Sequence, residues 1–272
     1  VLLLTVFLVS FLYFFLPKRN AHIIMKIDNA HNGDAKFYND YIVTEEEGKL
    51  VIYDMNGNQI KCFSDINAYW ISCMPQENCI IYANADCQIG VLKVDDDFNI
   101  ISNQIIMTTA NMQIDPALIK VHDTYYLTTT EIQGTANNAD MNAENGTYTL
   151  HLFKSTDLNK WSLVQDVVTA KNNIEDVDIM YLDEKLYITF EKEIVDKGDS
   201  SLNVAIIDTA QEKKTTITEL LPANCDHEPA SVTTIKNGFR LYYSCDKNYH
   251  GESYSGGQVF YSDYDTKGNP LS

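Results

Sequence analysis

Three carboxylic acids, Asp115, Asp176 and Glu228, open three similar segments of the sequence. In each segment the acid begins a run of strand-forming residues, and a tight turn and a second, tyrosine-rich run follow. When several carboxyl groups share one pocket, ionisation of one disfavours ionisation of the next, so their pKa values separate. Such a group can therefore supply a protonated acid and an ionised carboxylate together, which is the requirement of general acid–base chemistry.

The spacing of the three segments is regular. Asp115 precedes Tyr126 by eleven positions, and Asp176 precedes Tyr187 by the same number. In the third segment Glu228 precedes Tyr242 by fourteen positions, which predicts a longer turn there. Third strands are expected at 148–154, 202–207 and 257–262, and two weaker units at about 36–60 and 66–108. The sequence thus contains five units of three or four short strands.

This repetition predicts the fold class. No stretch keeps a 3.6-residue apolar period, so helices should be few and the fold all-β. Five units of this length predict a five-bladed β-propeller. A β-sandwich with as many strands is the alternative, but it gives no reason for the unit of acid, strand, turn and tyrosine-rich strand to recur. In a propeller the first residues of the blades converge at one end of the central channel, so the three acids should face one another there.

The chain resembles the five-bladed propellers of glycoside hydrolase families 43 and 32. Those proteins carry an Asp-Pro near the start of a blade, followed by a strand, a turn and a Tyr-Tyr-Leu strand, as in residues 115–127 here. They also carry a Ser-x-Asp-Leu-x-x-Trp corner between outer strands, matched by residues 155–161. Later blades open with Asp and Glu, matched by Asp176 and by Glu228 before Pro229. The resemblance covers about residues 60–265.

The resemblance implies cleavage of a glycosidic bond. Glu228 would be the general acid, Asp176 would hold Glu228 and a sugar hydroxyl in place, and Asp115 would be the base. If the family mechanism carries over, the reaction inverts and the separation between base and acid is about 6.5–9.5 Å, whereas a separation near 5 Å would indicate retention. In those families the base lies two blades before the helper Asp, and residues 65–70 offer Asp65 there without an Asp-Pro.

This departure leaves other interpretations open. Asp115 or Asp65 could be the base, or the base could be missing. A chain without the base would be a non-catalytic carbohydrate-binding propeller, and a chain without a shared carboxylate pocket would be a scaffold for protein partners. Further residues predicted to bind substrate are His227, Asp178, Glu191, Glu131 and Tyr254, the last in a glycine-rich loop over 248–257. Strand-end acids such as Glu131 and Glu191 could equally be solvated.

Composition limits the partners. The 20 basic and 38 acidic residues give a net charge of −18, which repels phosphate backbones and argues against nucleic acid. A carbohydrate is the expected partner. No loop has the spacing of a calcium-binding hand, and no metal or cofactor is predicted. Six cysteines show no CxxC pair and no histidine at zinc-finger spacing, and the sequence leaves open whether they form disulfides.

The first sixteen residues form an apolar run before Pro17, Lys18 and Arg19. About twenty apolar residues are needed to span a bilayer. Because the sequence does not begin with Met, the native apolar run could be longer than sixteen residues, so we expect an uncleaved membrane anchor. A cleaved signal peptide and a buried core segment are the alternatives. The predicted organisation is an anchor or signal over 1–19, a linker over 20–35 and the propeller over 36–272. We expect the propeller on the extracytoplasmic side, with the cytoplasmic side left open because of Lys18 and Arg19.

Overall fold

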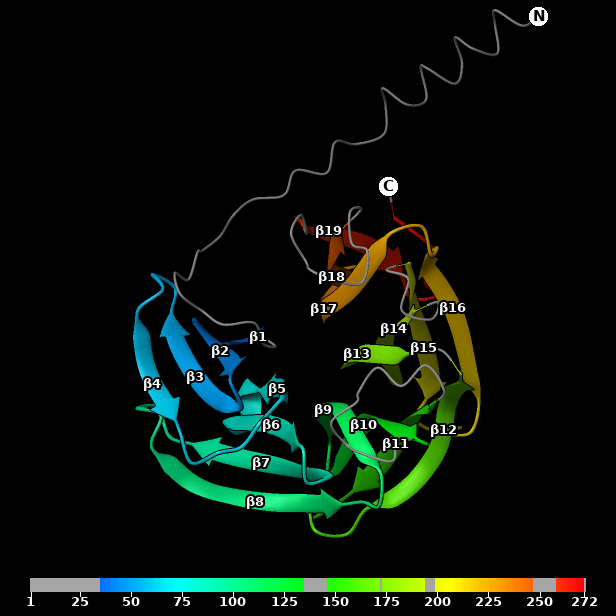
Figure 1. The fold of residues 1–272 in the computed structure, drawn as a ribbon. Coiled ribbons are helices and arrows are strands. Elements are labelled where there is room, and N and C mark those ends of the chain that lie inside the picture. Colours follow the sequence, from blue (N-terminus) through cyan, green and yellow to red (C-terminus); the bar gives the residue numbers. More distant parts are fainter. Residues whose placement is uncertain (1–34, 135–145, 172, 194–198, 247–257, 272) are drawn as a thin grey trace, which may run out of the picture.

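The computed structural model describes residues 35–134, 146–171, 173–193, 199–246 and 258–271. Five antiparallel sheets stand around a common centre, as in a propeller (Figure 1). The sheets, here called blades I to V, follow one another along the chain. Their first strands β1 (Ala35–Tyr38), β5 (Trp70–Met74), β9 (Met112–Val121), β13 (Ile174–Leu182) and β17 (Asp226–Ile235) lie nearest the centre.

The other strands of each blade lie progressively further out. Blade I continues with β2 (Tyr41–Glu46), β3 (Lys49–Asp54) and β4 (Gln59–Phe63), and blade II with β6 (Cys79–Asn84), β7 (Gln88–Val94) and β8 (Ile100–Thr108). Blade III continues with β10 (Thr124–Gln133), β11 (Thr147–Ser155) and β12 (Ser162–Ala170), and blade IV with β14 (Lys185–Glu193), β15 (Ser200–Asp208) and β16 (Thr215–Leu221). Blade V continues with β18 (Gly238–Asp246) and β19 (Gln258–Asp265), and a short 3-10 turn (Pro75–Glu77) lies between β5 and β6.

Apolar layers between neighbouring blades hold the ring together. Alternate residues of a strand point to opposite faces of its sheet. A strand with apolar residues on both faces can therefore pack against both neighbouring blades. In blade IV, Ile188 and Phe190 pack against blade III, while Tyr187 packs against Phe239 of blade V. Similar buried clusters join blades I and II and blades II and III. Within the described residues no such cluster joins blade V to blade I, and the ring is open there in Figure 1.

Side chains of Asp, Asn and Ser fix the corners between outer strands. The Asp54 carboxylate accepts the backbone N–H groups of Asn56 and Asn58, 2.8 and 2.9 Å away, in the turn between β3 and β4. Asp95 and Asp265 make the equivalent turns of blades II and V. These contacts satisfy turn N–H groups that would otherwise lack a partner, which is the usual role of Asx turns.

The Ser-x-Asp-Leu-x-x-Trp segment forms the corner of blade III. Ser155 Oγ accepts the N–H groups of Asp157 and Leu158, and the Asp157 carboxylate accepts those of Asn159 and Lys160. The Trp161 indole N–H then donates to the Leu158 carbonyl at 3.1 Å. The motif is therefore a structural corner between β11 and β12.

The five-bladed, all-β prediction is confirmed. The expected anchor over 1–19 and most of the linker lie outside the described residues. Within the described ranges, the structure contains no helix with the length and apolar character that crossing a bilayer requires. The outermost strands β8, β12 and β16 were not individually predicted, because they are largely exposed and lack an alternating apolar pattern.

Candidate functional site

Asp115 and Asp176 occupy equivalent positions in blades III and IV. Each is the first residue of a β-bulge in an inner strand, and each has a positive φ, +48° for Asp115 and +52° for Asp176. Asp is among the few residues that tolerate this left-handed conformation, and bulges re-aim side chains next to functional sites. The two bulges are also bonded to each other, because Asp115 Oδ2 accepts the backbone N–H of Asp176 at 2.8 Å.

Glu228 is not the exact counterpart of these two aspartates. The inner strand of each of the last three blades meets the next strand through a two-residue turn, flanked by the pairs Val121 with Thr124, Leu182 with Lys185, and Ile235 with Gly238. The longer turn predicted for the third segment is therefore wrong. The counterpart of Tyr187 is Arg240 rather than Tyr242, so the counterpart of Asp176 is Pro229. Glu228 lies one residue earlier and pairs with Ser244, as Glu175 pairs with Glu191.

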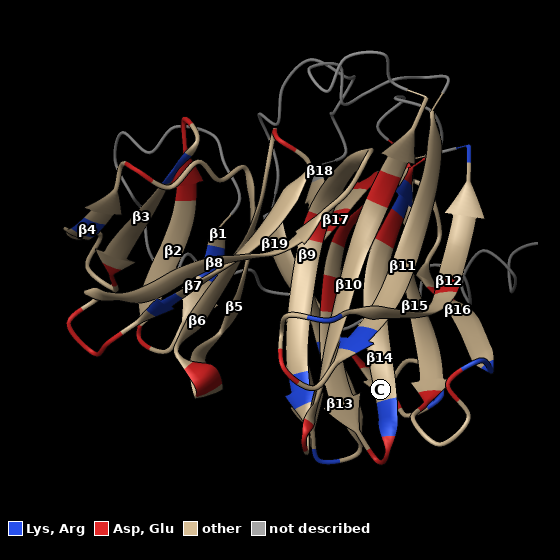
Figure 2. Cartoon of the chain, turned by 90° about the horizontal axis from the view of Figure 1, so that it is seen from below, with Lys and Arg blue, Asp and Glu red and all other residues tan. Residues whose placement is uncertain are grey.

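Five carboxyl groups from blades IV and V come together on three strands. Glu175 and Asp176 are on β13, Glu191 is on β14, and Asp226 and Glu228 are on β17. Burial raises the pKa of Glu191 well above its usual value, and the charges of the other four acids raise it further, in the order Asp176, Glu175, Glu228 and Asp226. Acidic positions within the strands around β17 appear as red segments in Figure 2.

Strand pairing explains the state of Glu191. Glu175 and Glu191 are directly opposite each other on adjacent strands, and like charges in such a pair are destabilising. Glu191 is only 5% exposed, so water cannot screen the repulsion. Holding a proton on Glu191 removes both costs, which is why its pKa rises. The other four acids differ in their exposure to solvent. Asp226 is only 4% exposed, whereas partial exposure is found for Glu175, Asp176 and Glu228.

Glu228 combines access with a hydrogen-bond partner. Its Oε2 accepts a hydrogen bond from Ser244 Oγ at 3.3 Å across the β17–β18 pair. Ser244 is the counterpart in blade V of Glu191 in blade IV, so a neutral hydroxyl faces Glu228 where an acid faces Glu175. This carboxyl is therefore both partly exposed and hydrogen-bonded through one of its oxygens.

Asp178 joins blade IV to blade V. Its Oδ1 accepts the N–H of Ile179 and its Oδ2 accepts the N–H of Val232 on β17, both at 2.8 Å. Desolvation raises the pKa of Asp178, although Lys36 on β1 and these N–H donors oppose the rise. The influence of Lys36 places Asp178 within electrostatic reach of blade I at the centre of the ring. Both carboxylate oxygens have backbone partners, so the observed contacts of Asp178 are structural.

His227 is turned toward blade IV. It is 6% exposed, its Nδ1 lies 2.8 Å from the carbonyl oxygen of Ser200, and its ring packs edge-on against Tyr243 at 6.0 Å. Its backbone N–H also donates to Ser200 Oγ. Side chains alternate along β17, so His227 and its neighbour Glu228 point to opposite faces of the strand.

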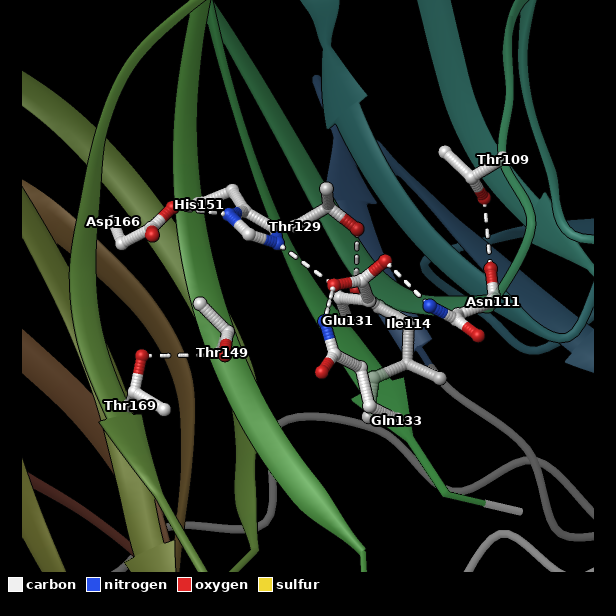
Figure 3. A network of polar contacts seen from close by, with 10 residues as sticks. All are labelled: Thr109, Asn111, Ile114, Thr129, Glu131, Gln133, Thr149, His151, Asp166 and Thr169. Atoms are coloured by element: carbon white, nitrogen blue, oxygen red, sulfur yellow. Dashed lines mark hydrogen bonds and ion pairs between the residues drawn. The ribbon is translucent and has the colours of Figure 1, made fainter.

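Glu131 belongs to a separate network in blade III, shown in Figure 3. Its carboxylate accepts hydrogen bonds from Asn111 at 3.0 Å and from Gln133 at 2.6 Å, and lies 3.4 Å from His151 Nε2. His151 Nδ1 in turn lies 2.8 Å from Asp166. Burial acts to raise the pKa of Glu131, but these donors outweigh burial and lower it. None of these contacts reaches the five acids. In the strand register Glu131 is the counterpart of Lys192, and the counterpart of Glu191 is Thr130.

The two remaining candidates stand apart from the cluster or outside the described residues. Asp65 is exposed in the loop between β4 and β5, 3.4 Å from Ser64 Oγ. Tyr254 lies outside the described residues. Neither Asp226 nor Glu175 is singled out in the sequence analysis. Each lies next to a predicted site residue on β13 or β17, and the folded structure shows that their charges act on Glu191.

The fold and the carboxylate cluster together define the chain as a five-bladed β-propeller with acids gathered on blades IV and V. No family model and no curated protein sequence matches the chain. Solved structures do match, at sequence identities that establish the fold alone. A thermostable family-43 glycoside hydrolase matches with a TM-score of 0.54 at 10% identity, over 89% of this chain and 94% of the other.

Two further structures share the fold. The α-L-arabinofuranosidase from Podospora anserina in complex with cellotriose matches with a TM-score of 0.55 at 11% identity, over 89% of this chain and 95% of the other. The exo-β-1,3-galactanase from Phanerochaete chrysosporium with β-1,3-galactotriose matches with a TM-score of 0.54 at 10% identity, over 92% of this chain and 65% of the other. The architecture of this chain is thus one on which glycoside hydrolases are built.

Proposed function

We propose that this protein is a glycoside hydrolase whose active site is the carboxylate cluster of blades IV and V. The observation that carries the proposal is Glu191, a buried carboxyl whose pKa is raised by four acidic neighbours. Because of this raised pKa, Glu191 keeps a proton to a higher pH than an isolated glutamic acid does. Hydrolysis of a glycosidic bond requires a protonated carboxyl beside an ionised one, because the first must protonate the leaving oxygen while the second activates water or attacks the sugar.

Access to solvent decides the proposed roles. Glu228 is partly exposed and held by Ser244, so it is the acid that meets the leaving oxygen. Glu191 is too buried to touch a substrate, and it acts as a positioning residue that keeps a proton in the cluster. Asp176 is partly exposed and is the acid whose charge acts most strongly on Glu191, so we assign it as the partner of Glu228.

Asp115 receives a different role from the one its resemblance to the family implies. Its side chain is 7% exposed and its Oδ2 accepts the N–H of Asp176. We assign it the positioning of Asp176 rather than contact with water or sugar. Among the five acids of the cluster, Asp176 is then the partly exposed Asp that can act as base or nucleophile.

A carbohydrate is the ligand class that the fold and the cluster favour together. Structures with this fold hold cellotriose and β-1,3-galactotriose. A sugar offers several hydroxyl donors, and a group of carboxylate acceptors suits them.

The test is a hydrolysis assay against a panel of oligosaccharides and aryl glycosides. The wild-type protein should release sugar, and Glu228→Gln should lower kcat by about 10²–10⁴-fold, the range for loss of a general acid. Glu219→Gln, an exposed acid on the outer strand β16, is the matched control and should retain activity. Equal activity of the Glu228→Gln protein and the wild type would exclude the assigned acid.

Non-catalytic carbohydrate binding is the second candidate. It is favoured by one observation: Asp65, which the family resemblance offers as the base, is exposed in a loop, where its carboxylate accepts a hydrogen bond from Ser64 Oγ. Under this alternative the wild-type protein would bind an oligosaccharide in equilibrium titrations and release no sugar from any member of the panel.

A further inference from the structure

Blade V has one face that lies outside the apolar layers between the blades. Successive residues of β18 and β19 point to opposite faces of the sheet, and Leu241 and Phe260 lie on the face that packs against blade IV. The opposite face, here called the tyrosine face, carries three cross-strand pairs: Ser244 with Val259, Tyr242 with Tyr261, and Arg240 with Asp263. None of these six residues belongs to an apolar cluster of the described part of the chain.

The tyrosine face continues from the carboxylate cluster. Ser244 donates to Glu228 at 3.3 Å, and Tyr242 lies two residues away on the same face of β18. Tyr261 lies opposite Tyr242 on the next strand outward. A spacing of about 4.8 Å between strands and a rise of about 3.4 Å per residue place the backbones of Glu228 and Tyr261 about 12 Å apart. A single sugar ring held at Glu228 would therefore end short of Tyr261, whereas a longer chain can reach it.

The two tyrosines are held in place while part of their surface stays exposed. Arg240 donates to the Asp263 carboxylate oxygens at 2.7 and 2.9 Å, and its Cζ lies 4.0 Å from the centroid of the Tyr261 ring. Arg240 also hydrogen-bonds Tyr242, whose ring centroid is 6.1 Å from that of Tyr261. Tyr261 is 49% exposed and Tyr242 is partly exposed. A ring that is already fixed loses little conformational freedom when a ligand binds.

The chemistry of this face matches that of a sugar chain. A tyrosine combines an apolar ring with a polar hydroxyl, and a sugar combines C–H faces with hydroxyl groups. The charged side chains of the face, Arg240 and Asp263, are paired with each other. Building on the function proposed above, we infer that Tyr242 and Tyr261 contact a sugar chain that extends outward from Glu228. The substrate class is then an oligosaccharide of several units rather than one glycosyl group on a small aglycone.

The test measures binding by calorimetry in the Glu228→Gln protein, so that bound chains are cleaved slowly or not at all. The ligands are the oligosaccharides of the hydrolysis panel, in lengths from two to six sugar units. Affinity should rise with length until the chain reaches Tyr261 and should then stay constant. Tyr261→Ala in the same background should weaken binding of the longest chains at least about 5-fold, the effect of truncating a tyrosine that carries binding energy, and should leave binding of the disaccharides unchanged.

Two further variants separate contact with the sugar from a structural role. Tyr261→Phe keeps the ring beside Arg240, so it should bind long chains nearly as tightly as its parent. Ile217→Ala removes an exposed apolar side chain from the outer strand of blade IV and should leave binding unchanged. Equal affinity for all chain lengths, or equal effects of Tyr261→Ala on short and long chains, would overturn the inference.

Hydrolysis and chain-length dependence are separate outcomes. If the wild-type protein releases no sugar but Tyr261 still determines the preference for long chains, the proposed hydrolase is wrong and the contact of the tyrosine face with sugar stands. If the wild-type protein releases sugar with a kcat/KM that depends neither on chain length nor on Tyr261, the hydrolase stands and the role of the tyrosine face is wrong.

Discussion

The raised pKa of Glu191 is the single-residue property with the widest consequences. Its pKa is raised in the folded protein by burial and by four neighbouring acids. In the unfolded chain a glutamic acid has a pKa of about 4.3. Between that value and the folded value the native state binds more protons than the unfolded state, so stability falls as pH rises through this window.

We predict that Glu191→Gln removes this fall. Glutamine is neutral at every pH, so the variant should lose the pH dependence that Glu191 contributes and should be more stable than the wild type above the folded pKa of Glu191. Free energies of unfolding in urea, measured across a pH series, check this expectation. The control Glu219→Gln should keep the slope of the wild type. Parallel curves for wild type and Glu191→Gln would show that Glu191 is ionised like an ordinary acid.

At the scale of elements, the two bulges in β9 and β13 place the acids of the site. A bulge opposes two residues to one and re-aims the side chain at its first position. Because the Asp115 carboxylate accepts the N–H of Asp176, the bulge of one blade is held by the bulge of its neighbour. The site therefore depends on contact between blades as well as on pairing within each sheet.

Removal of this contact should destabilise the fold. Asp115→Ala leaves the N–H of Asp176 without that acceptor and places alanine at a positive φ, so we expect a loss of at least about 1–3 kcal/mol in the free energy of unfolding. Asp115→Asn keeps an acceptor and tolerates the conformation, so its loss should be smaller. Asp65→Ala, at an exposed loop position, is the control and should be nearly neutral. Equal stability of Asp115→Ala and Asp65→Ala would contradict the role given to Asp115.

Many of the strands and blade starts could be predicted from the sequence. The inner three strands of the last three blades carry alternating apolar and aromatic residues that mark them as strands, and the recurrence of Asp before the Tyr-rich strand located the blade starts. The register could not be predicted, because the spacing from Glu228 to Tyr242 suggested a longer turn, whereas Arg240 is the true counterpart of Tyr126 and Tyr187. The sequence also grouped Glu191 with Glu131 as strand-end acids, although the counterpart of Glu191 in blade III is Thr130.

At the scale of the whole molecule, the blades differ in whether an apolar layer covers one or both faces of the sheet. Blade IV has an apolar layer on each side, one shared with blade III and one with blade V. Among the described residues blades I and V each share such a layer with a single neighbour. Blade V also has only three described strands, and Val259 and Tyr261 of its last strand are largely exposed.

This asymmetry predicts unequal resistance to local opening. Amide hydrogens should exchange most slowly in β14 and β15, which lie inside blade IV between two apolar layers, and faster in β2, β3 and β18 of the first and last blades, because opening free energy follows buried apolar contact. Native-state hydrogen exchange followed by mass spectrometry measures this difference. Uniform protection across the five blades would indicate that blades I and V are sealed as tightly as the others.

The central claim, that the acids of blades IV and V receive a carbohydrate, is tested most directly by a crystal structure of the Glu228→Gln protein with an oligosaccharide that the wild-type protein binds or cleaves. We predict that a sugar ring lies within hydrogen-bond distance of position 228 and of Asp176, with Glu191 behind them and out of contact. A sugar bound elsewhere, touching none of the five acids, would contradict the claim.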